Sequence, residues 1–212
     1  MKILIVGLGT IAKKHITAIK HLNINFELYA LRSKIDAHKI DGIVNIFNLE
    51  GNINFDFAII SNPTFLHEAF ILNLLKMKIP IFIEKPVTYK LDNIDFILKK
   101  VEEINLFTYV GCNLRFHPCI LFIKKKLEEE KPIINECNIY CGSFLPNWRP
   151  DRNYKSFYSV NSSMGGGVHL DLFHEFDYTI WLFGFPLKKH SLLRNVSSLN
   201  IEAIDYANLA PA

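Results

Sequence analysis

Glycines follow directly after an apolar run at the start of the chain. The run ends at Val6 and leads into Gly7-x-Gly9-x-x-Ala12, and a helical pattern begins at Thr10. Gly7 permits a tight turn, Gly9 lets a phosphate approach the backbone, and Ala12 lets helix and strand pack closely. The helix N-terminus offers N–H groups and a positive dipole to an anion. The order of strand, glycine turn and helix therefore predicts a dinucleotide pyrophosphate at Gly7, Gly9, Thr10 and Ile11; a plain strand–helix turn is the alternative.

The end of the second predicted strand should distinguish between the two nicotinamide cofactors. Enzymes that use NAD place Asp or Glu there to bind the ribose hydroxyls. This chain has Tyr29-Ala-Leu-Arg-Ser33 at that point, without an acid. A guanidinium beside a hydroxyl suits a 2′-phosphate, so Arg32 and Ser33 favour NADP(H). NAD(H) stays open, because Asp36 follows shortly afterwards and an arginine also stacks on adenine.

The composition narrows the class of protein. The 212 residues are half hydrophobic, which suffices for one large domain or for one domain and part of another. The net charge of +3, with acids and bases interspersed, argues against a nucleic acid or a membrane surface as partner. No apolar stretch resembles a secretory leader or spans a bilayer, so we expect a cytoplasmic protein. The cysteines fit no metal-ligand spacing, and we expect no metal site but free, buried thiols at Cys112, Cys119, Cys137 and Cys141.

Strand and helix patterns alternate through the first half of the chain, which predicts a parallel sheet with crossover helices. Strands are expected near residues 2–6, 26–31, 43–47, 56–60, 79–83 and 107–110, and helices near 10–21, 64–76, 91–103 and 117–129. The pattern then changes: 132–144 predicts a long strand, followed by a polar, aromatic loop, a helix near 168–183 and a strand near 187–195. The fold class is therefore α/β, with a Rossmann NAD(P)-binding domain over 1–118 and a second domain over 119–212.

Several separate segments resemble one family. They are Gly7-Leu-Gly-Thr-Ile-Ala-Lys-Lys-His15, Ser61-Asn-Pro-Thr-Phe-Leu-His67, Ile83-Glu-Lys-Pro-Val87, Asn113-Leu-Arg-Phe-His-Pro118 and Gly165-Gly-Gly-Val-His-Leu-Asp-Leu-Phe-His174. Together they resemble the Gfo/Idh/MocA oxidoreductases, which include glucose–fructose oxidoreductase and inositol dehydrogenase. The resemblance implies hydride transfer between a nicotinamide and a sugar or polyol carbon. Leu145-Pro-Asn-Trp-Arg-Pro150 with Tyr154 and Tyr158 looks like a subgroup associated with bacterial surface-sugar pathways.

The resemblance implies catalytic roles for three residues. Lys85, at the carboxyl end of a strand, is the expected acid or base, with Pro86 giving a cis peptide; a surface lysine beside a tight turn is the alternative. Asp171 and His174, three apart on a predicted helix, should share one face, with Asp171 supporting a substrate-binding or proton-transferring His174. Their spacing is shorter than the family's usual one, and a half-buried structural histidine stays open for His174. His169 and Asp177 are expected to be structural.

Further residues take roles by the same resemblance. Asn62, Pro63 and His67 should line the cleft beside the cofactor, and Glu84 should meet the nicotinamide ribose. Trp148 and Arg149 should cover cofactor or substrate, or else anchor an oligomer contact. The expected substrate-binding residues are Arg115, Tyr154 and Tyr158.

The family's second domain is built on an open, mainly antiparallel sheet that extends well past the length of this chain. We therefore expect a partial α+β domain, C-terminally shortened by truncation or in the gene. By analogy with relatives, self-association through that sheet is expected. The leading hypothesis is an NADP-dependent sugar oxidoreductase, and the alternative is a non-catalytic NAD(P)-binding interaction or sensing protein.

Overall fold

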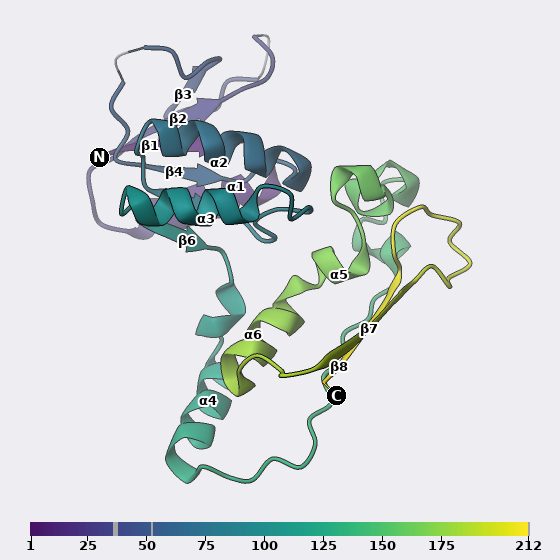
Figure 1. Ribbon diagram of the computed structural model, residues 1–212. Helices are drawn as coiled ribbons and strands as arrows, with labels where there is room; N and C mark the ends of the chain where they lie inside the picture. The colour runs from purple at the N-terminus through teal and green to yellow at the C-terminus, as the bar shows by residue number, and fades with distance from the viewer. Residues whose placement is uncertain (36–37, 52, 212) are drawn as a thin grey trace. The chain divides into compact units, whose positions relative to one another are not determined.

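The computed structural model describes residues 1–35, 38–51 and 53–211 (Figure 1). Contacts divide the chain into two compact units, Met1–Gly111 and Cys112–Ala212, called unit 1 and unit 2 below. The boundary expected from the sequence, between 118 and 119, lies at the first turn of helix α4, Pro118–Glu130.

Unit 1 is built on a six-stranded sheet in the order β3-β2-β1-β4-β5-β6, with every neighbouring pair parallel. The strands are β1 Lys2–Val6, β2 Glu27–Leu31, β3 Ile43–Ile46, β4 Phe57–Ile60, β5 Ile81–Ile83 and β6 Thr108–Val110. Val6 pairs with both Leu31 and Ile60, so the central strands end at one level. Because the strand order reverses between β1 and β4, a crevice is expected outside their carboxyl ends. The predicted Rossmann fold is confirmed.

Helices cover both faces of this sheet, which explains why its strands are apolar throughout. The helices are α1 Thr10–His21, α2 His67–Lys76 and α3 Ile94–Glu103, with a 3-10 turn, η1 Thr64–Leu66, leading into α2. Leu4 and Val6 pack under α2 and α3, which lie side by side, while Ile3 and Ile5 pack under α1 (Figure 1). Successive strand residues point to opposite faces, so both sets of side chains need cover.

Unit 2 has little regular sheet. Its helices are η2 Asn113–Phe116, α4 Pro118–Glu130, η3 Leu145–Trp148, η4 Tyr154–Ser156, η5 Tyr158–Val160, η6 Ser162–Met164, α5 Val168–Asp171 and α6 Phe173–Phe183, and its strands are β7 Lys189–Arg194 and β8 Tyr206–Pro211. β7 and β8 form an antiparallel pair, in line with the α+β class expected of this part of the chain. No helix within the described ranges is long and apolar enough to cross a bilayer.

Two predicted elements of unit 2 are wrong. Residues 132–144 form neither strand nor helix, although their apolar pattern favours a strand. A strand needs a neighbour in register for its backbone hydrogen bonds, and in the described chain β7 and β8 pair with each other instead. The predicted helix over 168–183 is two helices, because the backbone of Leu172 leaves helical geometry (φ −98°, ψ 37°) between α5 and α6.

The cysteines are partly as expected. All four are free, but only Cys112 is buried, and Cys119, Cys137 and Cys141 are exposed. Cys137 and Cys141 fall within the segment that was expected to be a strand, so no packed sheet face covers them. A cysteine is buried only where the segment that carries it packs against another element.

Candidate functional site

The glycine turn has the geometry that the sequence predicts. β1 ends at Val6, α1 begins at Thr10, and Gly9 is the N-cap of α1. Gly7 has φ +84°, and a Cβ there would lie 2.6 Å from the Cα and Cβ of Asn62, so a side chain is excluded on both grounds. No side chain caps α1 and its first turn holds no acid, which leaves its N–H groups and dipole available to an anion.

A cleft of about 690 Å³ lies beside this turn, at the carboxyl ends of the central strands. Its lining includes Gly7 after β1, Arg32 and Ser33 after β2, and Asn62 and Pro63 after β4. Five of the predicted cofactor residues thus come from three separate strands to one cavity. Its volume lies in the range of pockets that hold nucleotide-sized ligands. Thr10 and Ile11, at the start of α1, are exposed.

The side chain of Asn62 is the feature that best fits a bound dinucleotide. Both of its amide atoms, Nδ2 and Oδ1, are buried, and neither has a hydrogen-bond partner within the described residues. A buried polar group left unpaired costs about 1–3 kcal/mol. Because Asn62 also lies against Gly7 and lines the cleft, a ligand with polar groups would satisfy both atoms.

The part of the cleft beside Arg32 and Ser33 carries opposing charges. Arg32 Nη1 donates weakly to His38 O (3.3 Å) and Asn45 Oδ1 (3.4 Å), so its guanidinium is held at the cleft beside Ser33. Glu50 lines the same cleft. This acid was missed from the sequence, because the usual acid follows β2, whereas Glu50 follows β3 and reaches the cleft through the sheet order. Asp36, the acid considered from the sequence, lies outside the described residues.

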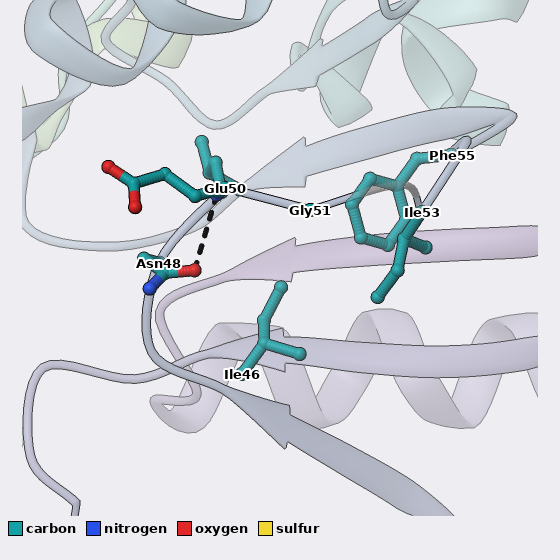
Figure 2. Close-up of a pocket in the computed structure, with 7 residues that line it drawn as sticks. Ile46, Asn48, Glu50, Gly51, Ile53 and Phe55 are labelled. Carbon is teal, nitrogen blue, oxygen red and sulfur yellow. Dashed lines mark hydrogen bonds between the residues drawn. The ribbon is translucent and has the colours of Figure 1, made fainter.

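The loop that carries Glu50 is folded by its own side chains. Glu50 N donates to Asn48 Oδ1 (3.2 Å), a turn in which an asparagine side chain bonds to the backbone two residues on (Figure 2). Ile46, Ile53 and Phe55 line a small pocket of about 60 Å³ beneath this turn. The turn therefore places Glu50 on a segment with a side-chain hydrogen bond of its own and apolar residues beneath it.

The Glu-Lys-Pro segment follows β5. Lys85 is half-buried there, and the peptide between Lys85 and Pro86 is cis, as expected. Glu84 Oε1 lies 2.5 Å from His15 Nε2, and the His15 ring meets Phe82 edge-on at 5.0 Å between centroids. His15 belongs to α1, so this contact joins the helix of the glycine turn to the strand end that carries Lys85. No role is predicted for His15 from local patterns, because its partner is 69 positions away along the chain.

His67, expected to line the cleft, is 1% exposed and is not among the residues that line it. Its ring lies among backbone carbonyls: Nδ1 is 3.0 Å from Pro86 O and 3.2 Å from Val87 O, and Nε2 is 2.9 Å from Asn62 O. Burial lowers the pKa of His67, while these carbonyls and the Glu84 carboxylate act in the opposite direction.

In unit 2, Asp171 ends α5 and His174 lies in the first turn of α6, so the helix break at Leu172 separates them. They do not share one continuous helix face, which corrects the expectation from their spacing. Tyr158 Oη donates to Asp171 Oδ1 at 3.0 Å. Burial and the Asp171 charge raise the pKa of Tyr158 to about 12, so this phenol keeps its proton at neutral pH. Burial lowers the pKa of His169.

Several other predicted residues bond within unit 2. Asp177 is buried and accepts two hydrogen bonds from Arg115, at 2.9 Å from Nε and 2.5 Å from Nη2. The Arg115 guanidinium also lies 5.8 Å from the Trp181 ring centroid. Asp177 thus forms an ion pair that links η2 to α6, in keeping with the structural role expected of it. Its partner, Arg115, is 62 positions away, so sequence spacing could not identify it.

The remaining predicted residues lie in the 3-10 segments of unit 2 or directly after one. Tyr154 Oη donates to Leu199 O (3.0 Å), Trp148 Nε1 donates to Ser143 Oγ (2.6 Å), and the Arg149 guanidinium lies 5.3 Å from the Phe157 ring centroid. Within the part of the chain that the structure describes, no three His, Cys, Asp or Glu side chains come together as a metal site requires.

Comparison with known proteins places unit 1 in a defined family. The family described as an oxidoreductase family with an NAD-binding Rossmann fold matches residues 1–112. An uncharacterized oxidoreductase, YrbE of Bacillus subtilis, is 29% identical over 96% of this chain and 61% of its own length. Inositol 2-dehydrogenase of Rhizobium meliloti is 25% identical over 85% of this chain and 54% of its own length. The chain thus spans somewhat over half the length of these relatives.

A solved structure extends the likeness to both units. The WlbA dehydrogenase from Thermus thermophilus, solved in complex with NAD and UDP-GlcNAcA, superimposes with a TM-score of 0.71 at 21% identity. The match covers 93% of this chain and 67% of that one. At this identity the likeness concerns the fold.

Proposed function

Because this chain belongs to the Gfo/Idh/MocA family of NAD-binding oxidoreductases, we propose that it transfers a hydride between a nicotinamide and a sugar or sugar-derivative carbon. The observation that carries the proposal is the unsatisfied Asn62 amide beside the glycine turn, in a cleft that Arg32, Ser33 and Pro63 also line. The inositol 2-dehydrogenase relative supports a polyol or sugar as substrate.

Unit 1 would hold the cofactor through groups it already presents. The N–H groups of Gly9, Thr10 and Ile11 would bind the pyrophosphate, and the Asn62 amide would bond to a polar group of the dinucleotide. Glu84 would meet the nicotinamide ribose, with His15 orienting its carboxylate. When bound, the nicotinamide supplies the site that accepts or donates the hydride.

Lys85 is the proposed acid or base. In the oxidation direction the neutral amine takes the hydroxyl proton at Nζ as the C–H hydride leaves, and in reduction the ammonium returns that proton to the carbonyl oxygen. His174 would bind substrate or share in the proton transfer. Asp171, whose carboxylate accepts a hydrogen bond from Tyr158, would support His174. Tyr154 and Arg115 would bind the substrate. Trp148 and Arg149 would cover cofactor or substrate.

For cofactor choice we propose a preference for NADP(H), which rests on Arg32 and Ser33 at the end of β2. NADPH and NADH are titrated against the protein while nicotinamide fluorescence and melting temperature are followed. NADPH should bind more tightly, and Arg32→Ala should weaken NADPH about tenfold more than NADH, because a charge-assisted bond to phosphate is lost. A wild-type preference for NADH would overturn the NADP(H) proposal and leave the oxidoreductase proposal intact.

The biological setting we propose is bacterial surface-carbohydrate biosynthesis. Residues 145–150 and the likeness to a WlbA dehydrogenase solved with UDP-GlcNAcA support it. The substrate screen should therefore begin with sugar nucleotides and their acid derivatives. Turnover of simple polyols but not of sugar nucleotides would contradict this setting.

A second candidate function is cofactor-dependent interaction or sensing without turnover. The observation in its favour is that every residue of β7 is exposed, which leaves a strand surface open to a partner. Lys85→Ala separates the two: in an enzyme the variant should lose turnover and keep cofactor binding. Full activity in Lys85→Ala would refute the role of Lys85. We also propose self-association through the β7–β8 sheet, which sedimentation at several concentrations would test.

A further inference from the structure

One buried imidazole joins two turns at the carboxyl edge of the sheet in unit 1. His67 begins α2, and its ring contacts the carbonyl of Asn62 on one side and those of Pro86 and Val87 on the other. Asn62 follows β4, and Pro86 and Val87 directly follow Lys85. The segment directly after β5 belongs to no helix or strand. Its backbone therefore lacks the hydrogen bonds of regular structure, and side-chain hydrogen bonds help to fix its position.

The chemistry of these contacts indicates which ring atom holds the segment. A carbonyl oxygen accepts only, so the imidazole must donate, and the neutral ring has one N–H. Nδ1 has two carbonyl oxygens within reach, whereas Nε2 has one. The tautomer with its proton on Nδ1 therefore makes the larger number of bonds, and both of them go to the residues that follow Lys85.

We propose that His67 is a positioning residue for Lys85: its Nδ1–H donates to Pro86 O and Val87 O and so fixes where the lysine backbone lies. This proposal rests on the proposed catalytic role of Lys85. With the two following carbonyls held, the backbone from which the Lys85 side chain extends is held as well. A reacting group displaced by about 1 Å loses about a hundredfold in rate, so such a hold has consequences for catalysis.

The wild-type protein tests the geometry without cofactor or substrate. In 15N-histidine-labelled protein at neutral pH, His67 should show a protonated Nδ1 whose hydrogen exchanges slowly with water. Its resonance is assigned by its disappearance in His67→Gln. A proton found on Nε2 alone would overturn the proposal, because the segment that carries Lys85 would then receive no bond from the ring.

Variants test the consequence for Lys85. The lysines are 13C-dimethylated, and the Lys85 signal is assigned by its loss in Lys85→Arg. His67→Phe keeps the ring shape and removes both nitrogens, so the Lys85 signal should move away from its wild-type position. His67→Gln, which restores an N–H donor, should return it part of the way. His21→Phe is the matched control: His21 Nδ1 also bonds to a carbonyl, Thr17 O at 2.7 Å, but on the exposed side of α1.

An unshifted Lys85 signal in folded His67→Phe would overturn the proposal, and if that variant does not fold, the position of the proton on the wild-type His67 ring, Nδ1 or Nε2, decides. Once a substrate is known, His67→Gln should lower kcat while the KM for the nicotinamide stays near wild type. The spectroscopic measurements need no ligand, so a failure of cofactor binding or turnover leaves their outcome readable and counts against the proposed function alone.

Discussion

Unit 1 and unit 2 hold their polar groups in different ways. In unit 1 the glycine turn, the cleft and the Lys85 segment stand on a parallel sheet buried on both faces, with Leu4, Val6, Ile3 and Ile5 almost fully inaccessible. In unit 2 every residue of β7 is exposed, and the predicted substrate-side groups are fixed by individual hydrogen bonds and ion pairs. The difference indicates that the cofactor half is organised by its core, and the other half by polar contacts.

The largest expected effect comes from one substitution made in each unit. Leu4→Ala should lower the free energy of unfolding by about 2–5 kcal/mol, because it leaves a cavity in a fully buried core. Leu192→Ala in β7, where the side chain is 41% exposed, should cost about 0.5 kcal/mol. Denaturant unfolding followed by circular dichroism measures both. Equal losses would mean that β7 is as well packed in solution as β1.

The glycine turn should be equally intolerant of a side chain. In Gly7→Ala the new Cβ would collide with the Asn62 backbone at a positive φ, so NAD(P)H affinity should fall about a hundredfold, near 2.7 kcal/mol. Gly42→Ala is the control, since Gly42 has φ +74° but open space around it. Fluorescence titration measures both affinities. Similar losses in the two variants would attribute the effect to backbone strain and not to the contact with Asn62.

In unit 2 the buried ion pair between Arg115 and Asp177 should contribute as much to stability as a core residue of modest size. Asp177→Asn should destabilise the protein by about 1–3 kcal/mol, because the ion pair between the Arg115 guanidinium and the buried Asp177 carboxylate is lost. Glu129→Gln, which breaks the exposed pair with Lys125, should change stability by less than about 0.5 kcal/mol. Thermal unfolding and limited proteolysis measure the two. No difference between them would mean that Asp177 does not tie α6 to η2.

The carboxylate of Glu50 should influence which cofactor the cleft of unit 1 prefers. Glu50→Gln should raise the affinity for NADPH relative to NADH by about fivefold, because it removes a carboxylate from the cleft that would repel a 2′-phosphate. Fluorescence titration with both cofactors gives the ratio, and Glu68→Gln on α2 is a control of equal charge change. An unchanged ratio would place the 2′ position out of reach of Glu50.

The smallest effect is a dependence on pH that belongs to unit 1. Burial lowers the pKa of His67 below the value near 6.5 that it has when unfolded, so the unfolded chain takes up the proton more readily. Stability should therefore be full above about pH 6.5 and fall as the pH drops through the lower folded value. Denaturant midpoints from pH 7.5 to 5 measure this, and His67→Gln should flatten the slope. An equal slope in that variant would assign the dependence to other groups.

Much of unit 1 followed from its sequence. The strands, α1 and the glycine turn were predicted close to their observed limits, because strand and turn signals are local: apolar runs, turn residues and glycines act within a few positions of one another. Arg32 and Ser33 were expected at the cleft from their place after the second strand, and Asn62 and Pro63 from the resemblance to the family. All four line it, since parallel strands end at one edge. In unit 2 prediction from local signals failed at residues 132–144, because whether a segment forms a strand depends on a neighbouring strand to pair with. It also failed at Leu172, whose non-helical backbone divides the predicted helix in two.

The sequence by itself determined the cofactor half: the order of strands and helices, the glycine turn and the strand ends that form the cleft. Only the tertiary structure decided which side chains meet across it. The contact of His15 with Glu84, the hold of His67 on the Lys85 segment, the presence of Glu50 in the cleft and the Arg115–Asp177 pair join residues far apart in the chain. The physical reason is that such contacts depend on how packed elements align in space, which no local pattern encodes.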